Sequence, residues 1–401
     1  MSISAYSDST FRKPLLPPGL LLTHEFPPIG GGISRYLWSI YSQFDLSNLI
    51  VLAPTSSRST DFDRLHDYHS DRIDNLPQIR GLYGGMYLWN TFRRARFHLQ
   101  NDGGVVLHCG TVRAALVASR LRRKFGTAYL VWTHALELTD RLLASQITGA
   151  LRDASLVFCP SDYTLRKLLS IGVPPHRIRK ICPGADTDRF TPTASRDDLA
   201  NRLGTCGRRV IMTVASMYPK TRYKGVDTVI RALPLVRNAV PDVVYLVCGA
   251  DLDRDYLAKI AAENGVSSIV MFAGAVAESD LPDAYNLCDV FVMCSREELL
   301  WRWTFAEGFG IVFLEASASG KPVVGGNTGG VPDAVKHRQT GLLVDACDVH
   351  SLASALICLL QDGELRATMG ANGRRWVEQE MTWARAAQQF STAYAELLGA
   401  V

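Results

Sequence analysis

Short apolar runs that alternate with longer amphipathic stretches constrain the fold of this 401-residue chain more than any other feature. Runs of this length are typical of buried strands in a parallel sheet, and the stretches between them are typical of connecting helices. The pattern predicts an α/β protein of the GT-B type, with two doubly wound, Rossmann-like domains that face each other across a cleft where ligands bind. The expected strands are residues 19–23, 49–53, 105–109, 128–132 and 156–159 in the first half, and 209–215, 243–248, 269–272, 290–294, 322–325 and 341–344 in the second.

The length also favours two domains, because one hydrophobic core seldom supports more than about 250–300 residues. We place the first domain at residues 20–192 and the second at residues 193–382, after a disordered tail at residues 1–19. Residues 383–401 are expected to form a helix that crosses back to the first domain. No apolar run is long enough to span a membrane, and the start of the chain lacks the apolar core of a signal peptide.

Charge and cysteine content narrow the setting in which the protein works. The nine cysteines include no C-x-x-C pair, which indicates free thiols in a reducing cytoplasm rather than disulfides or a zinc site. Residues up to Arg189 hold 23 Lys and Arg against 15 Asp and Glu, whereas the remaining residues hold 20 against 24. The basic first half favours an anionic partner such as a phosphorylated sugar or lipid headgroup. Nucleic acid is not expected, since no motif for binding it occurs.

Two carboxylates, Glu307 and Glu315, lie on either side of a glycine-containing turn. If a helix begins near Gly310, its first N–H groups and its positive dipole end lie between the two acids. Amides there suit a diphosphate and carboxylates suit sugar hydroxyls, so the segment is a candidate site for a sugar attached to a diphosphate. A solvated surface loop is the alternative, but the apolar residues 311–314 between the acids argue against it.

Positive and flexible groups that suit a diphosphate occur in two other places. Lys224 follows an apolar strand and precedes a glycine that opens a helix, so its ammonium can neutralise phosphate charge. Gly30, Gly31 and Gly32 form a loop that allows close approach of the backbone, and Arg35 enters the helix after it. A solvated lysine and an ordinary strand-to-helix turn are the respective alternatives.

Five motifs occur in an order that resembles the retaining GT-B glycosyltransferases of glycosyltransferase family 4, including bacterial phosphatidylinositol mannoside mannosyltransferases. The resemblance extends from about Leu20 to Leu398. It implies transfer of a hexose, mannose or glucose, from a nucleotide diphosphate sugar such as GDP-mannose or UDP-glucose to a lipid-linked or small alcohol acceptor. The motifs are Pro27-Pro-Ile-Gly-Gly-Gly-Ile-Ser-Arg35, Trp132-Thr-His-Ala-Leu-Glu137, Pro183-Gly-Ala-Asp-Thr-Asp-Arg-Phe190, Tyr223-Lys-Gly-Val-Asp227, and Glu307 to Glu315 followed by Thr328-Gly-Gly-Val-Pro-Asp333.

The resemblance also implies roles for individual residues. Glu307 would bind hydroxyls of the transferred hexose, Glu315 the ribose, and His134 the hexose near its anomeric centre. The catalytic set is therefore His134, Glu307 and Lys224. Donor binding is expected from Gly31, Gly32, Ser216, Lys220, Arg222, Lys224, Phe309, Gly310, Ile311, Val312 and Glu315. Acceptor binding is expected from Arg35, Glu137, Trp301 and Trp303.

The chain departs from the family at Ser216, where many relatives carry an arginine that acts as a second diphosphate cation. Either Lys220 or Arg222 is expected to replace it, and the sequence leaves the choice open. Two Asp-x-Asp pairs resemble metal-binding motifs, but we expect a structural turn at Asp186–Asp188 and a solvated loop at Asp251–Asp253. The resemblance implies no cofactor and no essential metal.

Residues 86–97 mix aromatic side chains with Arg93, Arg94 and Arg96, and residues 120–124 form a second basic cluster. On a helix this composition suits an anionic membrane surface, which would place the protein peripherally on the inner face of the cell membrane. An ordinary helix with buried aromatics and solvated arginines explains the composition equally well. Residues 299–305 are expected to form a loop whose tryptophans line the acceptor site or pack as a lid.

Two other functions stay open at this point. A GT-B epimerase or a phosphorylase would act on the same bound sugar. A degenerate homologue would bind the nucleotide only as a scaffold, and the missing arginine at Ser216 is the single feature in its favour.

Overall fold

In the computed structural model, the described residues are 13–74, 82–101, 105–139, 144–194, 196–300 and 303–399. The chain divides into two compact units. One comprises Met1–Trp132 and Asp153–Leu156, and the other Thr133–Arg152 and Val157–Val401. The predicted boundary at residues 192 and 193 lies between the last strand of one sheet and the first strand of the next, and it stays a prediction.

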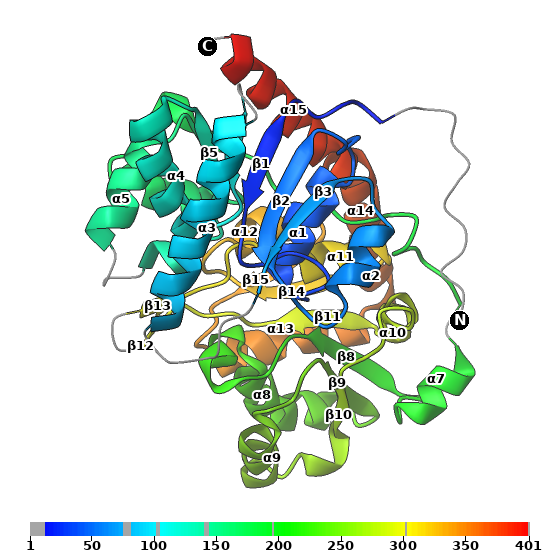
Figure 1. The fold of residues 1–401 in the computed structure, drawn as a ribbon. Coiled ribbons are helices and arrows are strands. Elements are labelled where there is room, and N and C mark those ends of the chain that lie inside the picture. The colour runs from blue at the N-terminus through cyan, green and yellow to red at the C-terminus, as the bar shows by residue number, and fades with distance from the viewer. Residues whose placement is uncertain are drawn as a thin grey trace. The chain divides into compact units, whose positions relative to one another are not determined.

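The first sheet has seven strands in the order β3-β2-β1-β4-β5-β6-β7 (Figure 1). Parallel ladders join β1 to both β2 and β4, and β2 to β3, as the alternating pattern predicts. The strands are β1 (Gly19–Leu22), β2 (Leu49–Pro54), β3 (His69–Ile73), β4 (Val106–Cys109), β5 (Tyr129–Trp132), β6 (Leu156–Cys159) and β7 (Ile178–Lys180). The helices along this part of the chain are α1 (Gly32–Tyr41), α2 (Ser59–Arg64), α3 (Leu82–Asn101), α4 (Val112–Phe125), α5 (Ala144–Asp153) and α6 (Asp162–Ser170).

The second sheet has six strands in the order β10-β9-β8-β11-β14-β15. Both sheets therefore show the strand order of a doubly wound fold, which confirms the predicted α/β class with two Rossmann-like domains. The strands are β8 (Arg209–Val214), β9 (Val243–Cys248), β10 (Val270–Gly274), β11 (Val290–Met293), β14 (Val323–Gly326) and β15 (Gly341–Val344). The helices are α7 (Asp197–Arg202), α8 (Val226–Ala239), α9 (Arg254–Glu263), α10 (Leu281–Leu287), α11 (Ile311–Ala318), α12 (Val331–Ala334), α13 (Val349–Gln361), α14 (Gly363–Glu380) and α15 (Trp383–Gly399).

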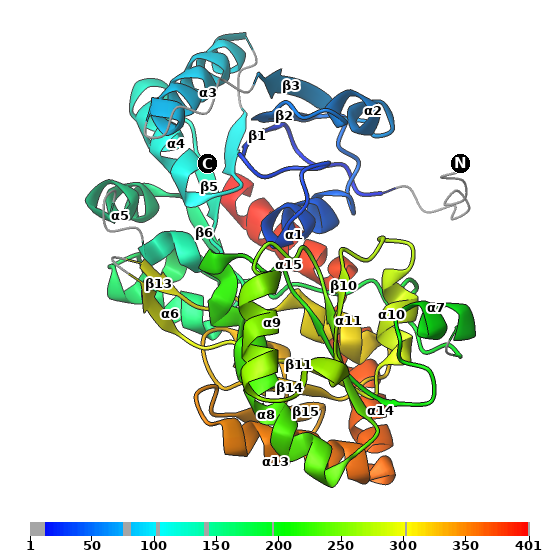
Figure 2. The same cartoon turned by 90° about the horizontal axis from the view of Figure 1, so that it is seen from below.

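Alternate residues of β9 point to two separate hydrophobic cores, one on each face of the second sheet. Val243, Tyr245 and Val247 pack with residues of α8, α9 and α13, whereas Val244 and Leu246 pack with residues of α10, α11 and α14. Figure 2 shows these helices around the sheet. Because both faces are covered, the strands are apolar throughout, which is why the sequence revealed them.

Three elements were not expected from the sequence. β3 and β7 are edge strands whose residues are mostly polar and partly exposed, so they lack the apolar run that marks a buried strand. The third is a hairpin of β12 (Glu298–Leu300) and β13 (Trp303–Phe305), whose strands pair antiparallel. The expectation of an irregular loop at residues 299–305 was therefore wrong, because the pairing depends on backbone hydrogen bonds that composition does not encode.

The two ends of the chain contact other elements where they are described. Residues 1–12 of the expected tail lie outside the described residues. Leu16 is buried, and its N–H donates to the carbonyl of Asp45. At the other end α15 contacts the last strands of the first sheet: the Phe390 ring centroid lies 5.5 Å from that of Phe158 on β6, and Arg179 on β7 forms an ion pair with Glu396 at 3.0 Å.

The expectations about cysteines and membrane-spanning segments also meet the structure. All nine cysteines are free, and six of them have pKa values raised chiefly by burial, to about 12 for Cys159, Cys248, Cys288 and Cys294. Among the described residues, no helix combines the length and the apolar character needed to cross a bilayer.

A buried histidine in the first sheet makes the stability of the protein depend on pH. His108 on β4 is fully buried, and its Nδ1 lies 2.8 Å from the hydroxyl of Tyr41. Burial lowers the pKa of His108 to about 3, so the ring is neutral in the folded state. The unfolded chain takes up this proton below about pH 6.5, so the free energy of unfolding falls as the pH falls from about 6.5 towards about 3.

We therefore expect wild-type protein to lose about 2 kcal/mol through this group between pH 7 and pH 5. His108→Gln should remove that part of the pH dependence, whatever its effect at pH 7. Urea unfolding at both pH values measures the difference, and His350→Gln at an exposed position is the matched control. An unchanged pH dependence in His108→Gln would contradict the assignment.

Candidate active site

The candidate active site is built on the two central strands of the second sheet. The strand order reverses between β8 and β11, and ligands of open α/β sheets bind beyond the carboxyl ends of the strands at such a point. The segment after β8 contains the short 3₁₀ helix η3 (Pro219–Lys224), and the segment after β11 leads through the hairpin to Glu307. The fold thus brings together two sequence-predicted segments that are far apart along the chain.

Lys224 and Glu307 form the centre of the candidate site. Lys224 Nζ lies 3.5 Å from Glu307 Oε2, and both side chains are largely buried, with 20% and 14% of their surface exposed. Within the described residues Glu307 Oε2 is buried and accepts no hydrogen bond. The separation from Nζ is too long for a strong charge-assisted hydrogen bond, so the carboxylate is paired electrostatically but retains capacity to accept one.

The helix between the two acids begins where the sequence predicts. Gly310 is the N-cap of α11 with φ 93°, a conformation that favours glycine, and Glu315 follows inside the helix. The first N–H groups of a helix have no acceptor within it, so those after Gly310 are available to an anion. Phe309 is buried, whereas Ile311 and Val312 are half-buried.

Glu315 is only 2% exposed and is held by a tyrosine that the sequence did not single out. Tyr285 on α10 donates its hydroxyl to Glu315 Oε2 at 2.8 Å. An aromatic residue in an apolar helix gives no sequence signal for such a partner. The pair fixes the rotamer of Glu315, because a buried carboxylate needs a donor.

His134 is in close main-chain contact with the segment that carries Glu307. A Cβ atom on Gly308 would lie 2.5 Å from the carbonyl oxygen of His134. On the other side, the N–H of Gly330 donates to the carbonyl of Glu307 at 2.8 Å. Ala135, next to His134, has φ 82°, a left-handed conformation that is uncommon outside glycine and clusters at functional sites. The three expected catalytic residues thus belong to one constellation, and their roles stay predictions.

Gly330 tests how tightly this constellation is packed. A Cβ atom there would lie 2.0 Å from the carbonyl oxygen of Gly308, so Gly330→Ala must displace the segment next to Glu307. We expect a loss of about 1–3 kcal/mol in the free energy of unfolding, measured by urea denaturation, together with reduced turnover. Gly149→Ala in α5 is the control, because a Cβ atom meets nothing within 4 Å there. Equal stability of the two variants would contradict the close packing.

The expected acceptor residues are only partly described. Glu137 lies in the short 3₁₀ helix η1 (Leu136–Thr139), and its Oε1 accepts the N–H of His134 at 2.7 Å. That bond orients the backbone of His134, a structural role that the sequence did not suggest. Trp301 lies outside the described residues, and Trp303 is described only as a backbone position in β13.

The structure distinguishes the two candidates for the second cation. Arg222 forms two hydrogen bonds to Asp253, at 2.6 and 2.7 Å, and its guanidinium lies 3.6 Å from the centroid of the Tyr256 ring. Lys220 and Ser216 are exposed, and Lys220 forms no ion pair within the described part of the chain. The expectation of a solvated loop at Asp251–Asp253 was wrong for Asp253, which is buried because its carboxylate holds Arg222.

The other Asp-x-Asp pair forms the expected turn. Asp186 Oδ1 accepts the N–H groups of Asp188 and Arg189, at 3.2 and 3.0 Å. The Asp186 carboxylate therefore closes a local turn, as aspartate often does.

The glycine loop belongs to the other unit of the chain. Gly31 is the N-cap of α1 with φ 143°, and its carbonyl accepts the N–H of Arg35 at 3.0 Å. Gly30, Gly31 and Gly32 are exposed, and the loop follows β1, a strand at the point where the first sheet reverses its order. The expected contact of Gly31, Gly32 and Arg35 with ligands stays a prediction.

Comparison with known proteins gives the class to which this fold and site belong. Residues 30–189 match the family described as Glycosyltransferase Family 4, and residues 204–376 match Glycosyl transferases group 1. Two solved structures share the fold with a TM-score of 0.78 and 21% identity: Anabaena Alr3699/HepE in complex with UDP and glucose, with 94% of this chain and 99% of that chain covered, and sucrose-phosphate synthase from Thermosynechococcus elongatus, with 97% and 100% covered. The protein is a GT-B glycosyltransferase.

Two curated proteins are similar over most of their length. A GDP-mannose-dependent alpha-(1-6)-phosphatidylinositol monomannoside mannosyltransferase of Mycobacterium tuberculosis is 34% identical over 371 residues, covering 91% of this chain and 94% of that protein. A GDP-mannose-dependent monoacylated alpha-(1-6)-phosphatidylinositol monomannoside mannosyltransferase of Corynebacterium glutamicum is 31% identical over 372 residues, with the same coverage. The chain belongs to the glycosyltransferase family of these enzymes, which confirms the resemblance drawn from the five motifs.

Proposed function

We propose that this protein transfers a mannosyl group from GDP-mannose to a lipid-linked alcohol, with retention of the anomeric configuration. The observation that carries the proposal is the buried Glu307 carboxylate, 3.5 Å from the Lys224 ammonium and directly before α11. The printed activities of the two mannosyltransferases favour mannose over glucose and a phosphatidylinositol mannoside as the acceptor class.

The donor would bind along three kinds of group. Lys224 and the first N–H groups of α11, near Gly310, Ile311 and Val312, would neutralise the diphosphate. Glu307 would accept hydrogen bonds from the mannose hydroxyls, which would satisfy its buried oxygen. Glu315, held by Tyr285, would accept a hydrogen bond from the ribose.

The reaction would follow a front-face path. The bond between the mannose anomeric carbon and the phosphate oxygen breaks, and a bond from the same carbon to the acceptor oxygen forms on the same face. The acceptor hydroxyl proton passes to the leaving phosphate, and GDP departs. Binding and electrostatic stabilisation would then account for most of the rate, with the His134 segment next to the anomeric centre.

We also propose that transfer needs no divalent metal. Lys224 and the α11 N-terminus would supply the positive charge that a metal supplies in other nucleotide-sugar enzymes. Activity that survives exhaustive dialysis against EDTA would support this, and activity restored only by added Mg²⁺ or Mn²⁺ would contradict it.

The experiment that tests the function uses purified protein, GDP-mannose and a phosphatidylinositol monomannoside acceptor. We expect formation of GDP and of a product that carries one more mannose, with the α configuration of the donor visible by NMR. UDP-glucose in parallel reactions tests the other predicted donor. A product of inverted configuration, or no product from either donor, would contradict the proposal.

Lys220 is the proposed replacement for the arginine missing at Ser216. Because Arg222 is held by Asp253, we expect Lys220→Gln to raise the KM for GDP-mannose by about 5–10-fold, the scale of one partly exposed charge on a phosphate. Arg222→Gln should mainly lower the melting temperature, because it leaves Asp253 buried without its partner. Steady-state kinetics and thermal unfolding of both variants measure the difference. A larger rise in KM for Arg222→Gln would reverse the assignment.

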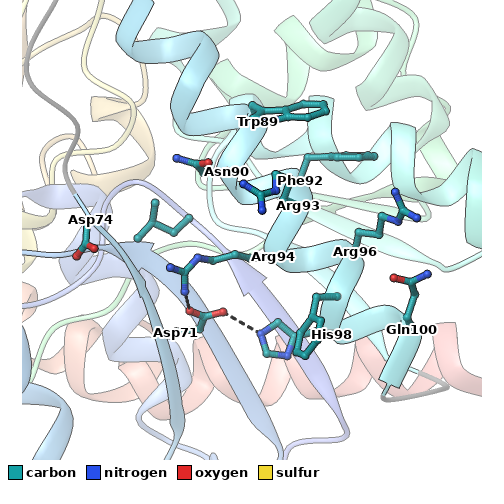
Figure 3. A pocket seen from close by; sticks show the side chains of 12 residues that line it. Asp71, Asp74, Trp89, Asn90, Phe92, Arg93, Arg94, Arg96, His98 and Gln100 are labelled. Atoms are coloured by element: carbon teal, nitrogen blue, oxygen red, sulfur yellow. Dashed lines mark hydrogen bonds and ion pairs between the residues drawn. The ribbon is translucent and has the colours of Figure 1, made fainter.

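A membrane surface is the proposed partner of α3. Its outer face exposes Trp89 and Phe97, which are 62% and 63% accessible, beside the exposed Arg93 and Arg96. Figure 3 shows these side chains around a hollow of ≈ 860 Å³. Exposed aromatic and basic groups on one helix suit the boundary of an anionic bilayer, where a lipid-linked acceptor resides. We propose peripheral attachment to the inner face of the cell membrane.

Liposome flotation tests this attachment. Wild-type protein should float with vesicles that contain phosphatidylinositol at low salt and should be released as the ionic strength rises. A variant that combines Trp89→Ser, Arg93→Gln and Arg96→Gln should lose flotation, whereas Lys259→Gln on α9 should keep it. Equal flotation of all three proteins, or none by the wild type, would exclude α3 as the docking face.

A further inference from the structure

Arg296 is fastened to the turn that carries Lys224, although neither motif analysis nor the proposed chemistry assigns it a role. It lies in the segment after β11, and only 18% of its side chain is exposed. Its Nη1 donates to Asp227 Oδ1 at 2.8 Å and to Thr228 Oγ1 at 3.1 Å. Its main-chain N–H donates to the carbonyl of Tyr223 at 2.8 Å. A single residue thus contacts the chain on both sides of Lys224.

The partner of Arg296 is a buried carboxylate with a second guanidinium. The Asp227 side chain is 8% exposed and lies in the first turn of α8. Arg231, one turn further along the same helix, donates to its other oxygen at 2.8 Å. Arg231 stays within α8, whereas Arg296 reaches Asp227 from a different segment of the chain. Only the Arg296 bond therefore ties the start of α8 to the segment that leads to Glu307.

The backbones of these two segments are also in direct contact. A Cβ atom on Gly225, the residue after Lys224, would lie 2.0 Å from the carbonyl oxygen of Cys294. The Tyr223 ring lies 5.9 Å from that of Phe305, at the end of the hairpin. Burial and the nearby Glu307 charge both raise the pKa of Tyr223, so its hydroxyl stays protonated. The Lys224 turn is held at its sides, and its ammonium lies 3.5 Å from Glu307.

We infer that Arg296 is a positioning residue: through Asp227 and Thr228 it holds the Lys224 turn at the distance from Glu307 that lets the two side chains engage one nucleotide sugar. The inference rests on the proposed function, in which Lys224 binds the diphosphate and Glu307 the hexose. Small displacements of such groups have large effects, since a misplacement of about 1 Å can cost about 100-fold in rate. Arg296 itself needs no contact with substrate.

A double-mutant cycle tests whether Arg296 acts through Lys224. Arg296→Met should lower kcat/KM for GDP-mannose about 10-fold or more and weaken the binding of GDP by a similar factor. The same substitution in a Lys224→Met background should have little further effect on GDP binding, because the group that it positions is already gone. Isothermal titration with GDP gives the four dissociation constants, and thermal unfolding gives the folded fraction of each variant.

Arg231→Met is the matched control, because it removes the other guanidinium from the same carboxylate without touching the segment after β11. We expect its kcat/KM to stay within about twofold of the wild type. Arg296→Lys, which keeps the charge but offers a different hydrogen-bond geometry, should recover part of the loss. Addition of millimolar guanidinium should also restore part of the activity of Arg296→Ala, a response that a general loss of stability would not give.

The outcomes separate this inference from the proposed function. If Arg296→Met and Arg231→Met lose equal activity, or if the Arg296 and Lys224 effects on GDP binding add, then Arg296 is only structural and the inference fails. If wild-type protein binds GDP but does not transfer mannose, the proposed donor or acceptor is wrong, while the cycle on GDP binding still decides the role of Arg296. If the nucleotide that binds is UDP, the same cycle with UDP decides it.

Discussion

Replacement of Glu307 by glutamine should lower kcat/KM for GDP-mannose by about 100–1,000-fold, or about 3–4 kcal/mol of transition-state stabilisation. The carboxylate is buried, accepts no hydrogen bond within the described residues, and has Lys224 at 3.5 Å. Glutamine has almost the same shape but accepts hydrogen bonds from mannose through one neutral oxygen and places an amide donor at the other position. The loss should therefore arise from the sugar and not from a change in fold.

Two measurements separate that cause from others. GDP lacks the hexose, so its dissociation constant should stay within about twofold in Glu307→Gln, because only interactions with the reacting sugar are changed. Glu263→Gln, at an exposed position on α9, is the matched control and should keep wild-type kinetics. Unchanged turnover in Glu307→Gln would remove the central element of the proposed function.

Lys224→Met should cause a loss of similar size by a different route. The ammonium is expected to neutralise the diphosphate, whose charge grows as the leaving group departs, so kcat/KM should fall about 100–1,000-fold. Unlike Glu307→Gln, this variant should also bind GDP more weakly, by about 10-fold or more, because a charge-assisted contact to phosphate is lost. Lys224→Arg should recover part of the binding of GDP but less of the turnover, since a planar fork does not reproduce a compact ammonium.

Isothermal titration with GDP and steady-state assays with GDP-mannose distinguish the two variants. Lys259→Met serves as the control, because that lysine is 76% exposed on α9. If Lys224→Met bound GDP as tightly as the wild type, the ammonium would not contact the diphosphate, and the donor would have to lie elsewhere.

The fold class was predictable because its signal is local. Both faces of the second sheet are covered by helices, so its strands had to be apolar along their whole length, and the runs at β8, β9 and β11 were visible as such. Strands without two covered faces were missed: β3 and β7 lie at sheet edges, and the β12–β13 hairpin pairs outside both main sheets. Their existence depends on backbone pairing, which residue type alone does not reveal.

The candidate site divides in the same way. Glu307, Gly310 and Glu315 lie within one short segment, so their order around a helix start could be inferred from the sequence. The choice between Lys220 and Arg222 could not, because it depends on Asp253, which arrives from the segment after β9. Tyr285, which holds Glu315, comes from another helix and carried no signal.

The sequence by itself determined the α/β class, the helix start between two acids and the membership in a glycosyltransferase family, because each is written in neighbouring residues or in the order of short motifs. Only the tertiary structure decided which charges pair: Lys224 with Glu307, Arg222 with Asp253, and Arg296 with Asp227. Those pairs join segments that follow different strands. An ion pair depends on a separation of a few ångströms, and the distance between two such segments is set by the packing of the sheet and not by either segment alone.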